Sequence, residues 1–147
     1  MVTTVGTGSD PKTVVSDLIQ LERDAIAAYD TTIDRLTNAE AKGKIDEFKQ
    51  DHLRHLEELE GFARDLGADI PTDTDAKAML TQGKVAIAAL GSDEAVLGAM
   101  STNETDTVTA YRNGCDNASL PDTMRPMLER ALEDEQRHKT WMDSASA

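Results

Sequence analysis

Two short runs of the chain nearly match: Asp51-His52-Leu53-Arg54-His55 and Asp134-Glu135-Gln136-Arg137-His138. Each run closes one half of the sequence, and each half also holds a glutamate seven residues before a tyrosine, Glu22 with Tyr29 and Glu104 with Tyr111. All three histidines of the chain lie inside the two runs. The repetition predicts one helical hairpin written twice, and the clustered histidines indicate metal chemistry.

The composition bounds what the chain can be. Its 147 residues suffice for one domain with a buried core, and only 3% are aromatic, which favours a core of small and aliphatic side chains as in helix bundles. A net charge of -13 disfavours nucleic acid and anionic membranes as partners and fits a solvated surface. No apolar run reaches the ~18 residues of a membrane span and the start lacks a secretory signal, so we expect a cytoplasmic protein. Cys115 is the single cysteine, which excludes an internal disulfide and a four-thiolate iron site.

Apolar residues recur every three or four positions over most of the chain, with Asp10 and Ser92 as caps at two helix starts and Gly67 as a helix end. The predicted helices cover 11–37, 38–66, 93–113, and a stretch that begins between Pro121 and Pro126 and ends near Met142. Residues 68–91 form a long connection with a short helix over 77–90. We therefore expect an all-α fold: an antiparallel four-helix bundle over residues 11–147 with one long crossover connection, preceded by a flexible arm of residues 1–10.

Glu22 and Glu104 belong to the apolar stripes of their helices and should point into the core. A buried carboxylate without partners is costly, and a cation is one way to compensate it. Residues three apart on a helix have Cβ atoms roughly 5 to 6 Å apart, so Glu135 with His138, and His52 with His55, can each approach one metal. Oxygen and imidazole donors favour iron, manganese or zinc over calcium or magnesium, with iron or manganese preferred.

These residues resemble the ferritin-like di-iron carboxylate superfamily. Its pattern is a Glu from each of two helices plus a Glu-x-x-His from each of the other two, and many members write the latter as Asp/Glu-Glu-x-Arg-His. The resemblance spans roughly residues 11–142, but His52 stands where the family has a bridging Glu. Some small bacterial ferritin-like proteins carry a similar Asp-His-x-Arg-His run. The resemblance implies two iron ions, with manganese or mixed iron and manganese as alternatives and zinc possible in crystals, held by Glu22, His52, His55, Glu104, Glu135 and His138.

The resemblance also implies supporting roles around the metals. Asp51 and Asp134 would accept a proton from the non-ligating nitrogen of a histidine on the partner helix, or else they pair with Arg54 and Arg137 as solvated acids. Tyr29 and Tyr111 would donate to a ligand carboxylate or act as redox-active phenols, and core tyrosines with satisfied hydroxyls are the structural alternative.

Two functions remain open at this point. The first is a metalloprotein with a dinuclear iron or manganese centre that reacts with dioxygen or hydrogen peroxide, as a ferroxidase or peroxidase-like oxidoreductase in iron handling or oxidative stress. The second is a non-catalytic bundle with a structural, storage or vacant metal site, which the exchange of a bridging acid for His52 would favour. A homodimer through exposed helix faces is the simplest assembly.

Overall fold

The computed structural model describes residues 3–72 and 86–147. Four long helices account for most of them: α1 (Pro11–Arg35), α2 (Ala39–Leu66), α4 (Asp93–Asp116) and α5 (Arg125–Ala145), the last preceded by the short 3-10 helix η1 (Asp122–Met124). The described residues contain no strand. The all-α class is therefore confirmed for this part of the chain.

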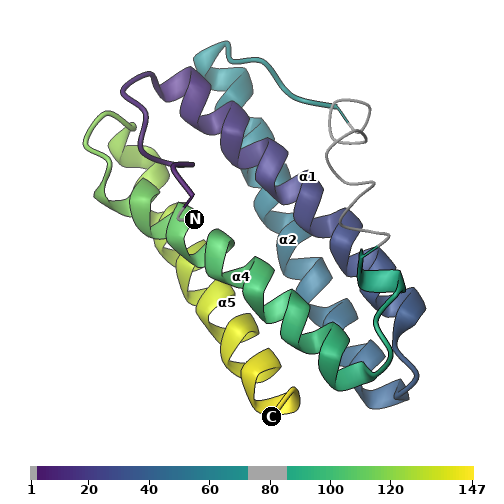
Figure 1. The fold of residues 1–147 in the computed structure, drawn as a ribbon. Helices are drawn as coiled ribbons and strands as arrows, with labels where there is room; N and C mark the ends of the chain where they lie inside the picture. Colours follow the sequence, from purple (N-terminus) through teal and green to yellow (C-terminus); the bar gives the residue numbers. More distant parts are fainter. Residues whose placement is uncertain (1–2, 73–85) are drawn as a thin grey trace.

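The helices form two hairpins that lie side by side (Figure 1). Residues 36–38 join α1 to α2, and residues 117–124 join α4 to α5. Each helix packs most extensively against its hairpin partner, and the hairpins meet where α1 contacts α4 and α2 contacts α5. All four helices thus border one shared interior.

The starts of the helices and the end of α2 lie close to their predicted positions. The side chains of Asp10, Asn38 and Ser92 accept hydrogen bonds from backbone N–H groups of the first turns, and Gly67 ends α2 with φ of +69°. The predicted ends differ by a few residues: α1 ends at Arg35, whereas α4 and α5 continue to Asp116 and Ala145. Gly114 of α4 faces Leu128 of α5, and a Cβ added to it would lie 3.4 Å from a Leu128 methyl group, which is an ordinary van der Waals contact. α4 continues through Gly114 to Asp116, although glycine disfavours helices.

The connection between the hairpins is described in part. Residues 86–88 are helical, while residues 77–85 of the predicted short helix lie outside the described residues. Beyond it, the Asp93 carboxylate accepts hydrogen bonds from the backbone N–H groups of Thr37 and Asn38, at 3.0 and 2.9 Å. The start of α4 is thereby tied to the turn between α1 and α2.

Residues 5–8, part of the N-terminal arm, lie against the end of α4. The side-chain amide of Asn113 donates to the Val5 carbonyl at 3.0 Å, and that of Asn117 donates to the Gly6 and Gly8 carbonyls at 2.7 and 2.8 Å. Gly6 has φ of +94°, and a Cβ on it would lie 2.5 Å from the Ala110 carbonyl oxygen. Only glycine fits this approach to α4.

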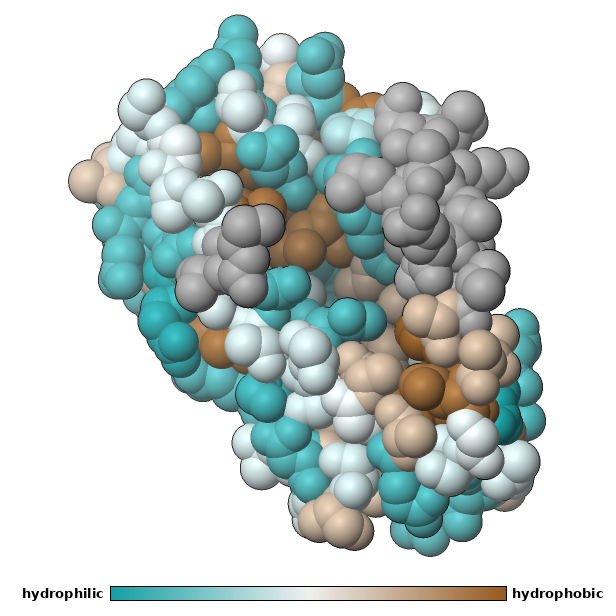
Figure 2. Space-filling model, in the orientation of Figure 1, coloured by the Kyte–Doolittle hydropathy of each residue, from teal (hydrophilic) through white to brown (hydrophobic). Residues whose placement is uncertain are grey.

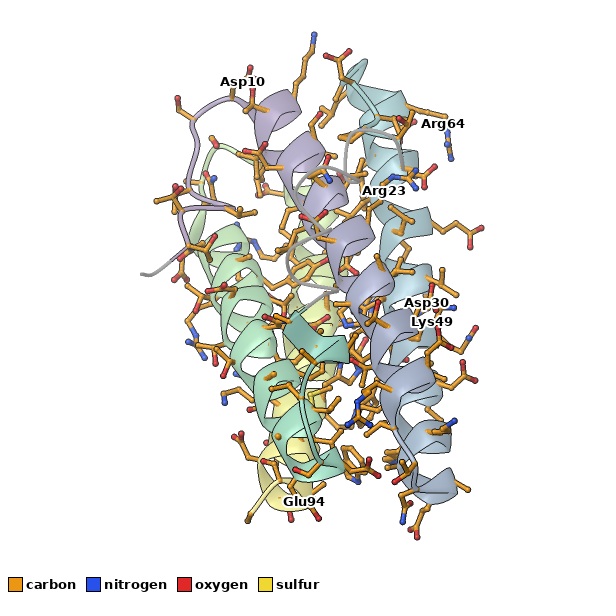
Figure 3. All side chains as sticks on the ribbon, turned by 45° about the vertical axis from the view of Figure 1, so that its right-hand side comes forward. Asp10, Arg23, Asp30, Lys49, Arg64 and Glu94 are labelled. Carbon is orange, nitrogen blue, oxygen red and sulfur yellow. The ribbon has the colours of Figure 1, made fainter. Side chains whose placement is uncertain are left out.

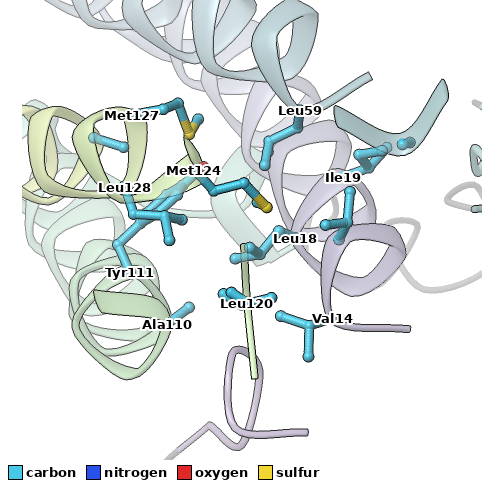
Figure 4. Close-up of a cluster of buried hydrophobic side chains, with 13 residues drawn as sticks. Val14, Leu18, Ile19, Leu59, Ala110, Tyr111, Leu120, Met124, Met127 and Leu128 are labelled. Carbon is cyan, nitrogen blue, oxygen red and sulfur yellow. The ribbon is translucent and has the colours of Figure 1, made fainter. Parts of the chain in front are cut away.

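The core consists of two apolar clusters at different levels of the helices. Figure 4 shows the first, which includes Tyr111 together with side chains from all four helices. The second contains Tyr29, with Phe48 and Met142 among its members. Burying each large aliphatic side chain contributes roughly 1.5–3 kcal/mol, which offsets the cost of burying polar groups between the clusters.

The face of the molecule that Figure 2 shows is largely hydrophilic. Figure 2 shows one face on which polar residues cover much of the helices and hydrophobic residues show mainly between them. Asp30 of α1 and Lys49 of α2, labelled in Figure 3, form an ion pair at 2.5 Å. Among the described residues, no helix has the length and apolar character that a membrane crossing requires.

Candidate metal centre

The six residues that the sequence singles out as ligands meet inside the molecule. Glu22 comes from α1, His52 and His55 from α2, Glu104 from α4, and Glu135 and His138 from α5. Each is at most 2% exposed. The apolar stripes of the four helices turn these side chains inward, so polar and apolar residues share the inner faces.

The donor atoms of these residues form two overlapping groups, in each of which all atoms lie within 4.8 Å of one another. We name them by their outer histidine. The His55 position comprises Glu22, His52, His55 and Glu135, and the His138 position comprises Glu104, His138, His52 and Glu135. Glu135 and His52 are therefore common to both.

Glu135 lies between the two outer histidines. Its Oε1 is 3.4 Å from His55 Nδ1, and its Oε2 is 3.5 Å from His138 Nδ1. One oxygen of this carboxylate thus lies near each outer histidine. His52 differs, because its Nδ1 already donates to Glu22 Oε2 at 2.7 Å.

Four buried polar atoms of the centre have no hydrogen-bond partner among the described residues. They are His52 Nε2, His55 Nδ1, His138 Nδ1 and Glu135 Oε1. Buried polar atoms are nearly always hydrogen-bonded, so four unpaired atoms in one place indicate that another group binds them. A metal ion accepts several lone pairs from one point, and the buried Glu and His groups can therefore hold one.

The outer nitrogens of two histidines are fixed by acids from the opposite helix. His55 Nε2–H donates to Asp134, and His138 Nε2–H donates to Asp51, both at 2.8 Å. A carboxylate accepts only, so these bonds leave each Nδ1 lone pair directed at the centre. Arg54 and Arg137 also contact these acids: Arg54 lies 2.8 Å from Asp134 and Arg137 lies 2.9 Å from Asp51. Both interactions expected for the two acids therefore occur together.

The two tyrosines exchange hydrogen bonds between the hairpins. Tyr111 of α4 donates to Glu22 of α1 at 2.5 Å, and Tyr29 of α1 donates to Glu104 of α4. Burial and the neighbouring carboxylate charges hold the pKa of both phenols well above the usual value, so they remain protonated donors.

Thr107 belongs to the site although sequence reasoning did not single it out. Its hydroxyl lies 2.7 Å from Glu104 Oε2 and 3.1 Å from Glu135 Oε2. Its position three residues after Glu104 on the inner face was the available signal. The equivalent residue in α1, three after Glu22, is Ala25, which has no hydroxyl.

Protons shared among the side chains compensate the buried carboxylates of the centre. Burial lowers the pKa of His55, but the hydrogen bond to Asp134 and the nearby carboxylates of Glu135 and Glu22 outweigh it and raise the pKa to about 11. Burial raises the pKa of Glu104, and the negative charge of Glu135 raises it further, to about 7. Burial likewise opposes ionisation of Glu135, but the charge of His52 prevails and lowers its pKa. A bound cation would replace some of these protons.

Comparison with known proteins identifies a family but gives no activity. The comparisons with curated proteins and with solved structures found no match. A family model described as a domain of unknown function, DUF2383, matches residues 10–116, which include α1, α2 and α4 with the ligand candidates Glu22, His52, His55 and Glu104. Since this match spans most of its length, the chain belongs to the DUF2383 family.

Proposed function

We propose that this chain is a ferritin-like four-helix metalloprotein that holds two iron or manganese ions and brings them into reaction with dioxygen or hydrogen peroxide. The observation that carries the proposal is the set of unpaired inward atoms from His52, His55, His138 and Glu135. Mixed imidazole and carboxylate donors suit iron and manganese better than calcium or magnesium. When bound, such ions supply one-electron chemistry toward oxygen or peroxide.

The protein groups would position the ions and balance charge. Glu135 would supply one oxygen to each position, Glu22 and Glu104 would each supply one further carboxylate, and the Asp–His hydrogen bonds would fix the outer imidazoles. Two divalent ions carry more positive charge than three carboxylates offset, so we expect the divalent state to be favoured. Tyr29 and Tyr111 would hold the terminal carboxylates in place.

A second function is supported by His52. Three imidazoles and three carboxylates can neutralise one another by sharing protons, because His52 already donates to Glu22 at 2.7 Å. Such a network would be compatible with a structural, storage or vacant site without oxygen chemistry. The two candidates therefore differ in oxygen reactivity rather than in fold.

The test is anaerobic loading of chelator-treated protein with ferrous iron. Elemental analysis should give two ions per chain, and oxygen should then produce an absorbance change and be consumed in proportion to the protein. Bound iron without a response to oxygen or peroxide would favour the non-catalytic site. Failure to retain iron or manganese after loading would overturn the metalloprotein proposal. A Leu53→Ala variant, altered at an exposed position of α2, is the matched control.

A further inference from the structure

The His55 and His138 positions have different donor sets, which separates them chemically. Nδ1 of His52 donates to Glu22, so only its Nε2 has a lone pair to offer, and this atom lies 3.4 Å from both Glu104 Oε1 and Glu135 Oε2. Its lone pair is therefore directed to the His138 position. Although His52 borders both positions, it can therefore offer its lone pair to only one of them: two imidazoles and two carboxylates serve the His138 position, and His55 with two carboxylates serves the His55 position.

The two outer histidines are also covered differently. The His138 ring stacks on Phe48, with centroids 4.3 Å apart and an interplanar angle of 28°, and Trp141 packs edge-on against Phe48 at 5.7 Å. Among the described residues, His55 has edge contacts with Tyr111 and His52 but no stacked ring. Ala131, which precedes His138 by the same seven residues as Phe48 precedes His55, has no ring to cover His55.

A surface pocket reaches one histidine and not the other. A pocket of about 240 Å³ between α2 and α5 has His55 in its wall, together with Glu58, Glu133 and Asp134 and two arginines. A second pocket between the same helices has Phe48 and Trp141 in its wall and does not include His138. Trp141 follows His138 by three residues, as Glu58 follows His55, so an aromatic ring stands in one half where an acid stands in the other.

The charges of the two pockets also favour entry of a cation at His55 rather than at His138. The pocket at His55 carries three acids against Arg54 and Arg130, whereas the pocket over Phe48 carries Lys44 and Arg137 and no acid. A cation approaching the centre meets less repulsion at His55. Donor set, covering and charge thus all distinguish the same two positions.

We propose that the centre holds one retained and one exchangeable cation. The His138 position keeps its ion because it has the additional His52 nitrogen and is sealed by Phe48 and Trp141. The His55 position exchanges its ion through the pocket between α2 and α5. This inference rests on the proposed two-metal function and adds that the two ions have different access and residence times.

The test is metal release from the full chain loaded with two equivalents of zinc, a redox-inert probe. After addition of excess chromogenic chelator, zinc should leave in two phases of equal amplitude. Glu58→Trp, which places in the pocket the ring found at the other histidine, should slow only the fast phase, by about tenfold. Trp141→Ala should accelerate only the slow phase. Leu53→Ala should alter neither, and circular dichroism checks that each variant keeps its helices.

The outcomes separate this inference from the function on which it rests. A protein that binds no zinc and no iron contradicts both. Two ions that leave in a single phase contradict only the inference, since the dinuclear site would still stand. The inference is also overturned if Glu58→Trp leaves the fast phase unchanged, because the pocket would then not be the exchange route. The Glu58→Trp arm remains decisive even if Trp141→Ala does not fold.

Discussion

The α1–α2 and α4–α5 hairpins supply matching side chains to the centre, but they differ at four equivalent places. Each provides a Glu with a Tyr two turns later, an Asp, an Arg and an outer His. Where α5 has Glu135 and Ala131, α2 has His52 and Phe48; where α4 has Thr107, α1 has Ala25; and where α5 has Trp141, α2 has Glu58. The shared residues are those that hold the carboxylates and imidazoles in place. The residues that differ give the two positions different donor atoms and different access from the surface.

The largest effect is expected at the carboxylate that both positions share. Glu135→Gln keeps the shape of the side chain but removes its charge, so affinity for both ions should fall by about a hundredfold or more. The matched change in the other hairpin, His52→Gln, should weaken mainly the His138 position. Zinc titration of both variants measures the difference. Equal losses in the two variants would mean that His52 serves both positions alike.

The next effect concerns the pH dependence of the metal-free protein. The pKa of His55 is raised to about 11, so its contribution to stability is fully present below its ordinary pKa near 6.5 and is lost as pH rises through about 11. The melting temperature of chelator-treated protein should therefore fall between neutral and strongly alkaline pH. His55→Gln should weaken this dependence of the melting temperature on pH. If the variant shows the same dependence as the parent chain, His55 is not the group responsible.

Replacing His52 by the glutamate that α5 has at the equivalent place should destabilise the protein when no metal is bound. His52→Glu places a fourth carboxylate in the centre and removes the donor to Glu22, so the free energy of unfolding of the metal-free protein should fall by about 3–5 kcal/mol. Metal should restore more stability than in the parent chain. Urea unfolding with and without zinc tests this, and His52→Gln separates loss of the imidazole from gain of charge.

Removing the tyrosine hydroxyls that form hydrogen bonds between the hairpins should reduce stability by a smaller amount, which is similar for the two tyrosines. Tyr29→Phe and Tyr111→Phe each delete one hydrogen bond to a buried carboxylate, which should cost about 1.5–3 kcal/mol of unfolding free energy in each case. Thermal unfolding of the two variants compares them directly. A large difference between them would show that the geometric equivalence of the hairpins does not extend to their energetics.

The smallest effect is expected at the arginines on the outside. Arg54 and Arg137 are about half exposed, at 49% and 54% of their side chains, and each pairs with an acid of the opposite helix. Arg54→Ala and Arg137→Ala should each lower stability by about 1 kcal/mol or less. Denaturant midpoints at low and high salt measure this, and a loss of several kcal/mol in either variant would assign these pairs a structural role.

Local chemistry made most of the helix boundaries predictable. Asp10, Asn38, Ser92 and Gly67 act within a few residues of their own positions, so a single sequence reveals them. The end of α4 was predicted a few residues too early, because its last turns pack against Leu128 of α5, a contact between residues distant in the sequence. The hydrogen bonds from Asn113 and Asn117 to the arm were missed for the same reason.

The site was predictable where spacing along one helix sufficed. Helical periodicity brings Glu135 and His138 to one face, and repetition of the pattern extends the prediction to His52 and His55. Spacing does not reveal what lies across the interface between helices. Phe48 on His138, Thr107 between two carboxylates, and the pocket at His55 each depend on residues from two helices, so they emerge only from the three-dimensional arrangement.

The crossed hydrogen bonds have a consequence for how the protein reaches its native state. Tyr29 and His138 donate to acids of the other hairpin, as do Tyr111 and His55. A hairpin on its own would have to leave these groups in water or bury them unsatisfied, which opposes closure of its interior. We therefore expect the hairpins to acquire their final packing together, in one cooperative transition, and neither to persist as a folded intermediate.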